Sequence, residues 1–70
     1  MPVTFKKWIL QFINEDSPRG DLAVDVRDDA PFPNSKMYRK IYDYLSRVGA
    51  SELYMQSFYR AWKTYKGEIK

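Results

Sequence analysis

The chain has 70 residues, 44% of them hydrophobic and 17% aromatic, and a formal net charge of +3. This length accommodates one domain, residues 1–70, and the apolar content excludes a disordered chain. Cysteine and histidine are both absent, which excludes disulfides, thiolate metal sites and acid–base chemistry based on histidine.

Residues 4–14 are predicted to form the first helix, with Thr4 as the cap of its first turn. The apolar residues follow the i, i+3, i+4, i+7 spacing of a helix with one buried stripe. They are Phe5, Trp8, Ile9, Phe12 and Ile13.

A turn is predicted in the next segment, "EDSPRGD", because Pro18 disfavours helical geometry at the residue before it and Gly20 tolerates positive φ. Asp21 is then the predicted cap of a short helix over about 21–29, since its carboxylate can accept from exposed backbone amides. Leu22 and Val26 face inward in this helix. The opposite side carries a candidate acidic patch of Asp25, Asp28 and Asp29.

Two prolines, Pro31 and Pro33, predict an extended corner that places Phe32 in the core. Ser35 is the predicted cap of a third helix over about 36–48, and Gly49 is the expected left-handed residue after it. The buried stripe of this helix is Tyr38, Ile41, Tyr42, Leu45 and Val48. Lys36, Arg39, Lys40 and Arg47 lie on its opposite side.

Ser51 is the predicted cap of the last helix, which runs to about residue 67. Its apolar stripe is Tyr54, Phe58, Ala61, Trp62, Tyr65 and Ile69. Tyr59, Arg60, Lys63 and Lys66 cluster on an adjoining sector.

Charge is distributed unevenly along the chain. Residues 15–29 hold six acidic residues against two arginines, a net charge of −4, whereas residues 36–70 hold eight basic residues against three acidic ones, a net charge of +5. With +2 from residues 1–14, these blocks account for the total of +3. The folded protein is therefore expected to carry separate acidic and basic surfaces.

Four segments spread over about residues 4–66 are "FKKWILQF", "PRGDLAVDVRDDAPFP", "IYDYL" and "YMQSFYRAWKTY". Together they carry a resemblance to the YozE-like family of small bacterial proteins, found chiefly in Gram-positive bacteria. It implies an all-α fold similar to the sterile-alpha-motif (SAM) class, with four or five helices packed as two roughly orthogonal hairpins. A fifth helix would be a single turn near residues 31–35. The biochemical role of the family is uncharacterised, so the resemblance supplies no site residues.

Helical periodicity assigns most of the large apolar residues to the core. The predicted core residues are Trp8, Phe12, Leu22, Phe32, Ile41, Leu45, Phe58 and Trp62. Tyr44 and Tyr59 lie off the apolar stripes and are expected to be exposed. The remaining question is what the charged surface does.

Two functions fit this surface. The first is a non-catalytic protein-interaction module with an unknown protein partner or weak self-association. The alternative is a weak, salt-dependent nucleic-acid-binding domain. The candidate contacts for either partner are Arg39, Lys40, Arg47, Tyr59, Arg60, Lys63 and Lys66.

Other functions have less support in the sequence. Asp21, Asp25 and Asp28 share a helix face, but the ligand pattern of a calcium-binding EF-hand loop is missing, so no metal or other cofactor is expected. No nucleophile is accompanied by an activating base, so we expect no enzyme activity. No apolar run approaches the ~20 residues of a membrane-spanning helix and the N-terminus lacks a signal-peptide core, so a cytoplasmic location without membrane partners is expected.

Overall fold

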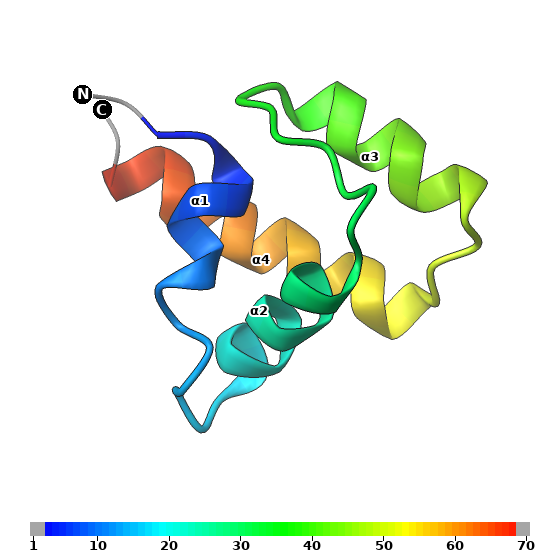
Figure 1. The fold of residues 1–70 in the computed structure, drawn as a ribbon. Helices are drawn as coiled ribbons and strands as arrows, with labels where there is room; N and C mark the ends of the chain where they lie inside the picture. Colours follow the sequence, from blue (N-terminus) through cyan, green and yellow to red (C-terminus); the bar gives the residue numbers. More distant parts are fainter. Residues whose placement is uncertain (1–2, 69–70) are drawn as a thin grey trace.

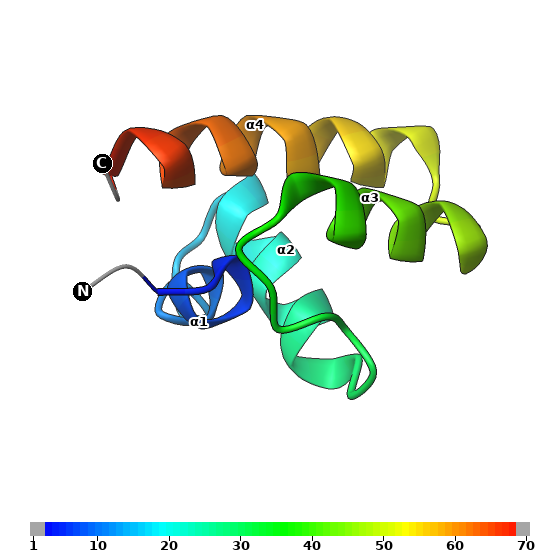
Figure 2. The ribbon, with the colours of Figure 1, turned by 90° about the horizontal axis from the view of Figure 1, so that it is seen from above.

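A computed structural model describes residues 3–68, which form four helices and no strand (Figure 1). The helices are α1 (Phe5–Leu10), α2 (Pro18–Asp28), α3 (Tyr38–Arg47) and α4 (Glu52–Glu68). Helices α1 and α2 pack against each other and against α4. Helix α3 runs antiparallel to α4 (Figure 2) and contacts it through the ring of Tyr38. The predicted all-α class is confirmed. Residues 32–35 form no helical turn, so the single-turn fifth helix is absent there.

Helix α1 begins as predicted and ends earlier than predicted. The Thr4 hydroxyl oxygen accepts from the backbone N–H of Lys7 at 3.2 Å. The helix ends at Leu10 instead of residue 14, because Phe12 N–H donates three residues back, to Ile9 O, at 3.0 Å. This tightened turn redirects residues 11–14 towards α2.

Helix α2 begins three residues before the predicted start, and its cap is Ser17 instead of Asp21. Ser17 Oγ accepts from the backbone N–H of Gly20 at 3.1 Å, and Pro18 is the first helical residue. Proline is favoured there because its missing N–H has no intrahelical partner and its fixed φ matches the helix. Asp21 lies exposed in the first turn, where its charge still faces the positive end of the helix dipole.

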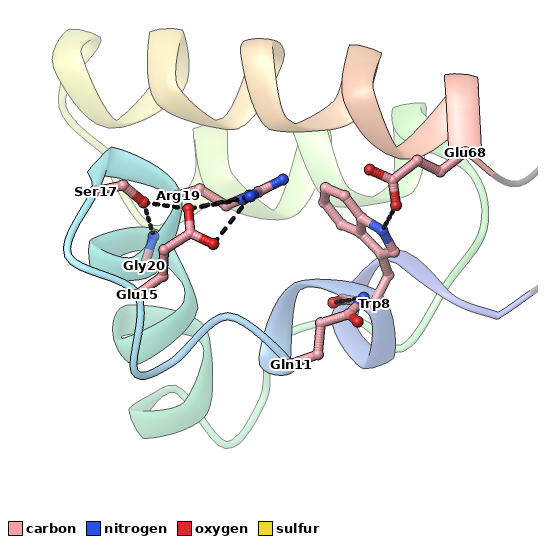
Figure 3. A network of polar contacts seen from close by, with 7 residues as sticks. All are labelled: Trp8, Gln11, Glu15, Ser17, Arg19, Gly20 and Glu68. Atoms are coloured by element: carbon pink, nitrogen blue, oxygen red, sulfur yellow. Dashed lines mark hydrogen bonds and ion pairs between the residues drawn. The ribbon is translucent and has the colours of Figure 1, made fainter.

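Gly20 is buried inside α2, and the predicted positive φ is wrong. Its role is close packing, because a Cβ at this position would lie 1.8 Å from the carbonyl oxygen of Glu15. The same turn is held by an ion pair between Arg19 Nη2 and Glu15 Oε2 at 2.9 Å (Figure 3). The guanidinium of Arg19 also lies 3.8 Å from the centre of the Phe12 ring.

The two later helices differ in how they begin. Ser35 does not cap α3: the cap position is Met37, and Ser35, two residues earlier, accepts from the Met37 N–H through its Oγ at 3.0 Å. Ser51 Oγ accepts from the Tyr54 N–H at 3.1 Å, as predicted for the start of α4. Gly49 has φ 76°, which confirms the left-handed residue between the two helices.

The core is an aromatic cluster built around Phe5, which is fully buried. The rings of Trp8, Phe32, Phe58, Trp62 and Tyr65 lie with their centres between 5.3 and 6.5 Å from that of Phe5. Leu22, Ile41 and Leu45 are also buried, as predicted. Phe12 is only half-buried, because the turn after α1 leaves it at the edge of the cluster under Arg19. Val48 is 57% exposed, since α3 ends before it.

Polar contacts connect α1 and the residues before it to α4. Trp8 Nε1 donates to Glu68 Oε1 at 2.9 Å, which joins α1 to the C-terminal turn of α4 (Figure 3). The Tyr65 hydroxyl donates to the carbonyl of Val3. Ile69, which the periodicity adds to the stripe of α4, lies outside the described residues.

Candidate functional site

A groove lies between the outer sides of α3 and α4, with a volume of ≈ 520 Å³. We call it the α3–α4 groove. Its lining residues are Tyr38 and Tyr42 from α3, and Glu52, Met55, Gln56, Tyr59, Arg60 and Lys63 from α4. The groove therefore combines aromatic and apolar side chains with two basic ones.

Tyr38 fixes the position of α3 against α4. Its ring stacks on Phe58 at 5.3 Å between centres, with 13° between the ring planes, and meets Trp62 edge-on at 5.4 Å. Tyr42, one turn further along α3, lies 5.8 Å from Tyr38. The short connection over residues 48–51 returns the chain along α3, which brings residues 55–63 opposite these tyrosines (Figure 2).

Two of the groove tyrosines are open to solvent. Tyr42 is 43% exposed and Tyr59 is 52% exposed, whereas Tyr38 is half-buried. Burial raises the pKa of Tyr38, and the neighbouring Tyr42 and Tyr59 raise it further. Three phenol groups therefore converge on one groove, and each hydroxyl can donate and accept hydrogen bonds.

The basic residues predicted as contacts divide into two groups. Arg60 and Lys63 line the groove beside Tyr59, and Lys63 Nζ lies 5.4 Å from the centre of the Tyr59 ring. Arg39 flanks the groove, in a smaller hollow of ≈ 300 Å³ that Tyr38 and Tyr42 also line.

The other three predicted contacts lie elsewhere. Lys40 and Arg47 are exposed about 180–200° around α3 from Tyr38, at 100° per residue, and so point away from the groove. Lys66 is exposed one turn beyond Lys63, towards the end of α4. The basic residues of α3 and α4 thus do not converge on a single surface. That any of them contacts a partner stays a prediction.

Periodicity predicts Tyr38 and Tyr42 in the buried stripe of α3, but Tyr42 is exposed in the groove, and Tyr38 is only partly buried, packed against the core at the edge of the groove. Ile41 and Leu45 face the core, and both tyrosines lie about 20–100° to one side of this pair on the helix. The neighbouring elements cover too little of α3 to bury all five large residues of its apolar stripe. The width of this stripe is the sequence signal that some of its residues are exposed.

The predicted acidic patch is also divided. Asp25 and Asp28 are exposed, and with Asp21 they form an acidic face of α2. Asp28 pairs with Arg27 at 3.1 Å in an exposed contact. Asp29 does not belong to this face, because it is half-buried and accepts from the Tyr44 hydroxyl at 2.7 and 2.9 Å.

Tyr44 is likewise half-buried, although its position off the stripe predicted exposure. Its ring meets Phe32 edge-on at 5.9 Å, and its hydrogen bond to Asp29 raises its pKa. This contact ties the middle of α3 to the end of α2, so Tyr44 and Asp29 are structural residues. Tyr59 remains the exposed aromatic residue of the predicted pair.

One hollow between α2 and α4, of ≈ 270 Å³, is lined in part by Asp21, Asp25 and Tyr54. Burial raises the pKa of Tyr54 to about 12, and the charges of Asp25 and Asp29 contribute. Within residues 3–68, no group of three acidic side chains is arranged to hold a metal ion. No helix in the same span is both long and apolar enough to cross a bilayer.

Comparison with known proteins gives one match. The family model described as YozE SAM-like fold matches residues 4–67, nearly the whole chain. No curated protein and no solved structure matches it. The resemblance carried by the sequence segments is thus supported over the full helical region.

Proposed function

Because the chain belongs to the family of small proteins with the YozE SAM-like fold, whose biochemical role is uncharacterised, we propose its function from its surface. The proposal is a non-catalytic protein-interaction module that binds its partner through the α3–α4 groove. A SAM-like fold alone does not specify function, so the argument rests on the groove residues.

The supporting observation is the composition of the groove. Tyr42 and Tyr59 are large rings left open to solvent in a chain that buries most of its other aromatic residues. Tyrosine, methionine and arginine are the residue types enriched at protein interfaces, and the groove holds all three. Aromatic and apolar side chains gathered in one exposed groove are typical of an interaction site, which favours a binding role.

The absence of catalysis is the second part of the proposal. The chain has neither histidine nor cysteine, the residues that most often serve as general base and as nucleophile. Among the described residues, 3–68, the groups with shifted pKa values are four tyrosines and one carboxylate in an ion pair, all explained by burial or a neighbouring partner.

Site-directed photo-crosslinking tests the proposal in cells that produce the protein. A photoreactive phenylalanine analogue replaces Tyr59 in one variant and Lys40, on the opposite side of α3, in a matched control. We expect protein adducts from position 59 that disappear when Arg60 is changed to Glu, and few from position 40. Equal adducts from both positions, or adducts to nucleic acid instead of protein, would contradict the proposal.

Self-association is checked separately by sedimentation at low and high salt. Complementary acidic and basic surfaces predict that any weak oligomer dissociates as salt screens the charges. If the protein is strictly monomeric at low salt, the partner of the groove is a different protein. Crosslinks between two copies would instead identify a second copy of the chain as the partner.

A further inference from the structure

The α3–α4 groove has two ridges with a hollow between them. Tyr38 and Tyr42 form one ridge and Met55 and Tyr59 form the other, and each pair is spaced i, i+4 on its own helix. Two helices side by side with such ridges offer a groove into which a third helix packs. Helix-in-groove recognition uses apolar residues at i, i+3, i+4 and i+7 of the incoming helix.

The charge at the groove is positive on one rim. Arg60 and Lys63 stand one turn apart on α4, and within residues 3–68 neither forms an ion pair with a carboxylate. Glu52 is the acidic residue of the lining, and it lies in the first turn of α4, about two turns before Arg60. The rim therefore complements a partner that carries carboxylates beside its apolar stripe.

We infer that the α3–α4 groove binds an acidic amphipathic helix of a partner protein, an inference that rests on the proposed function. Apolar side chains of that helix fill the hollow between the two ridges. Its carboxylates pair with Arg60 and Lys63.

Single-stranded nucleic acid fits the groove less well, because bases bind by stacking on open ring faces. Tyr38 is already stacked on Phe58, and Lys63 lies over the ring of Tyr59. A second copy of the chain fits less well too. Its exposed acidic helix is α2, and the apolar side chains of α2 are buried in its own core: Leu22, Ala23 and Val26.

The test is a titration of the isotope-labelled protein with a synthetic peptide, followed by backbone amide chemical shifts. The peptide has leucines at helical spacing on one face and glutamates on the other. A scrambled peptide of the same composition and an oligothymidine serve as comparison probes. We expect the largest shifts at residues 38–42 and 55–63, with the ordered peptide binding more tightly than either comparison probe.

Charge-reversal variants test which basic residues contribute to peptide binding. Arg60→Glu with Lys63→Glu is expected to weaken peptide binding about tenfold or more, because opposed charges at the rim become repulsive. Lys40→Glu with Arg47→Glu makes the same change of net charge on the far side of α3, and less than about a twofold effect is expected from it. The amide spectra of both double variants report directly whether the fold is retained.

Several outcomes overturn the inference. They are shifts centred on α2, equal weakening by the two double variants, or tighter binding of oligothymidine than of the ordered peptide. If position 59 still crosslinks to a protein while the acidic peptide does not bind, the groove is an interface for another kind of partner and only the helix inference fails. If both experiments are negative, the proposed function fails with it.

Discussion

Replacing Gly20 with alanine tests the close approach of the α2 backbone to the carbonyl of Glu15. The new Cβ would lie 1.8 Å from Glu15 O, and real Cβ atoms keep at least about 3.0 Å from such neighbours. The turn must therefore move by about 1.2 Å, the difference between these distances, and the obstacle is backbone, which cannot rotate away. Overpacking of this kind costs ~3 kcal/mol, and the better helix propensity of alanine returns ~1 kcal/mol. We expect a net loss of ~2 kcal/mol in the free energy of unfolding.

Urea denaturation followed by tryptophan fluorescence measures this loss. Gly67→Ala is the matched control, because Gly67 is also helical and a Cβ there meets nothing within 4 Å. The control is expected to be unchanged or more stable by up to ~1 kcal/mol. If Gly20→Ala is as stable as Gly67→Ala, the close contact with Glu15 is not present in solution and the reasoning is refuted.

Three further substitutions test the cap, the core and the alkaline limit of stability. Ser17→Ala should lower the free energy of unfolding, measured by urea denaturation, by ~0.5–2 kcal/mol and by more than Asp21→Ala does, since Ser17 is the cap. A larger loss for Asp21→Ala would show that Asp21 is the cap instead. Phe5→Ala should cost ~3–5 kcal/mol and leave little native signal in circular dichroism, because five rings surround it; a native thermal transition would contradict this. Because the pKa of Tyr54 is raised to about 12, its contribution to stability is present below pH 10 and lost as pH rises towards about 12. Tyr54→Phe should therefore lose less stability over that pH range than the original protein, by ~3 kcal/mol at most. An equal dependence of stability on pH in the two proteins would exclude this role.

The helices themselves follow from sequence periodicity. The Thr4 and Ser51 caps and the left-handed Gly49 are local features, and each is found where its residue type predicts it. The early end of α1 was not predictable, because residues 11–14 contain no glycine or proline. That end follows from packing, since the turn carries the Glu15 carbonyl to Gly20 and Phe12 to Arg19.

The start of α2 shows how a local signal can be misread. Pro18 predicts non-helical geometry at Ser17, which the structure confirms, but the turn predicted through Gly20 is wrong, because Ser–Pro supplies both a cap and a favoured first residue for a helix that begins at Pro18. That interpretation was available from the sequence alone. The role of Gly20 was not, because it depends on a contact with a residue outside the helix.

The candidate site was predictable in part. Tyr59, Arg60 and Lys63 share a sector of one helix, so periodicity alone places them together. Tyr38 and Tyr42 join them only because α3 packs beside α4, which the sequence of either helix does not specify. The structural role of Asp29 was not predictable from one helix either, because its contact with Tyr44 joins elements that are separate in sequence.

The central claim is that folding buries Tyr65 against Phe5 and leaves Tyr42 and Tyr59 open at the α3–α4 groove. Limited nitration of the folded protein, with each site quantified by mass spectrometry, tests it most directly. Tyr59 and Tyr42, at 52% and 43% exposure, should react first, and the fully buried Tyr65 should react last. Reaction of Tyr65 as fast as Tyr59 in the folded protein would contradict the account.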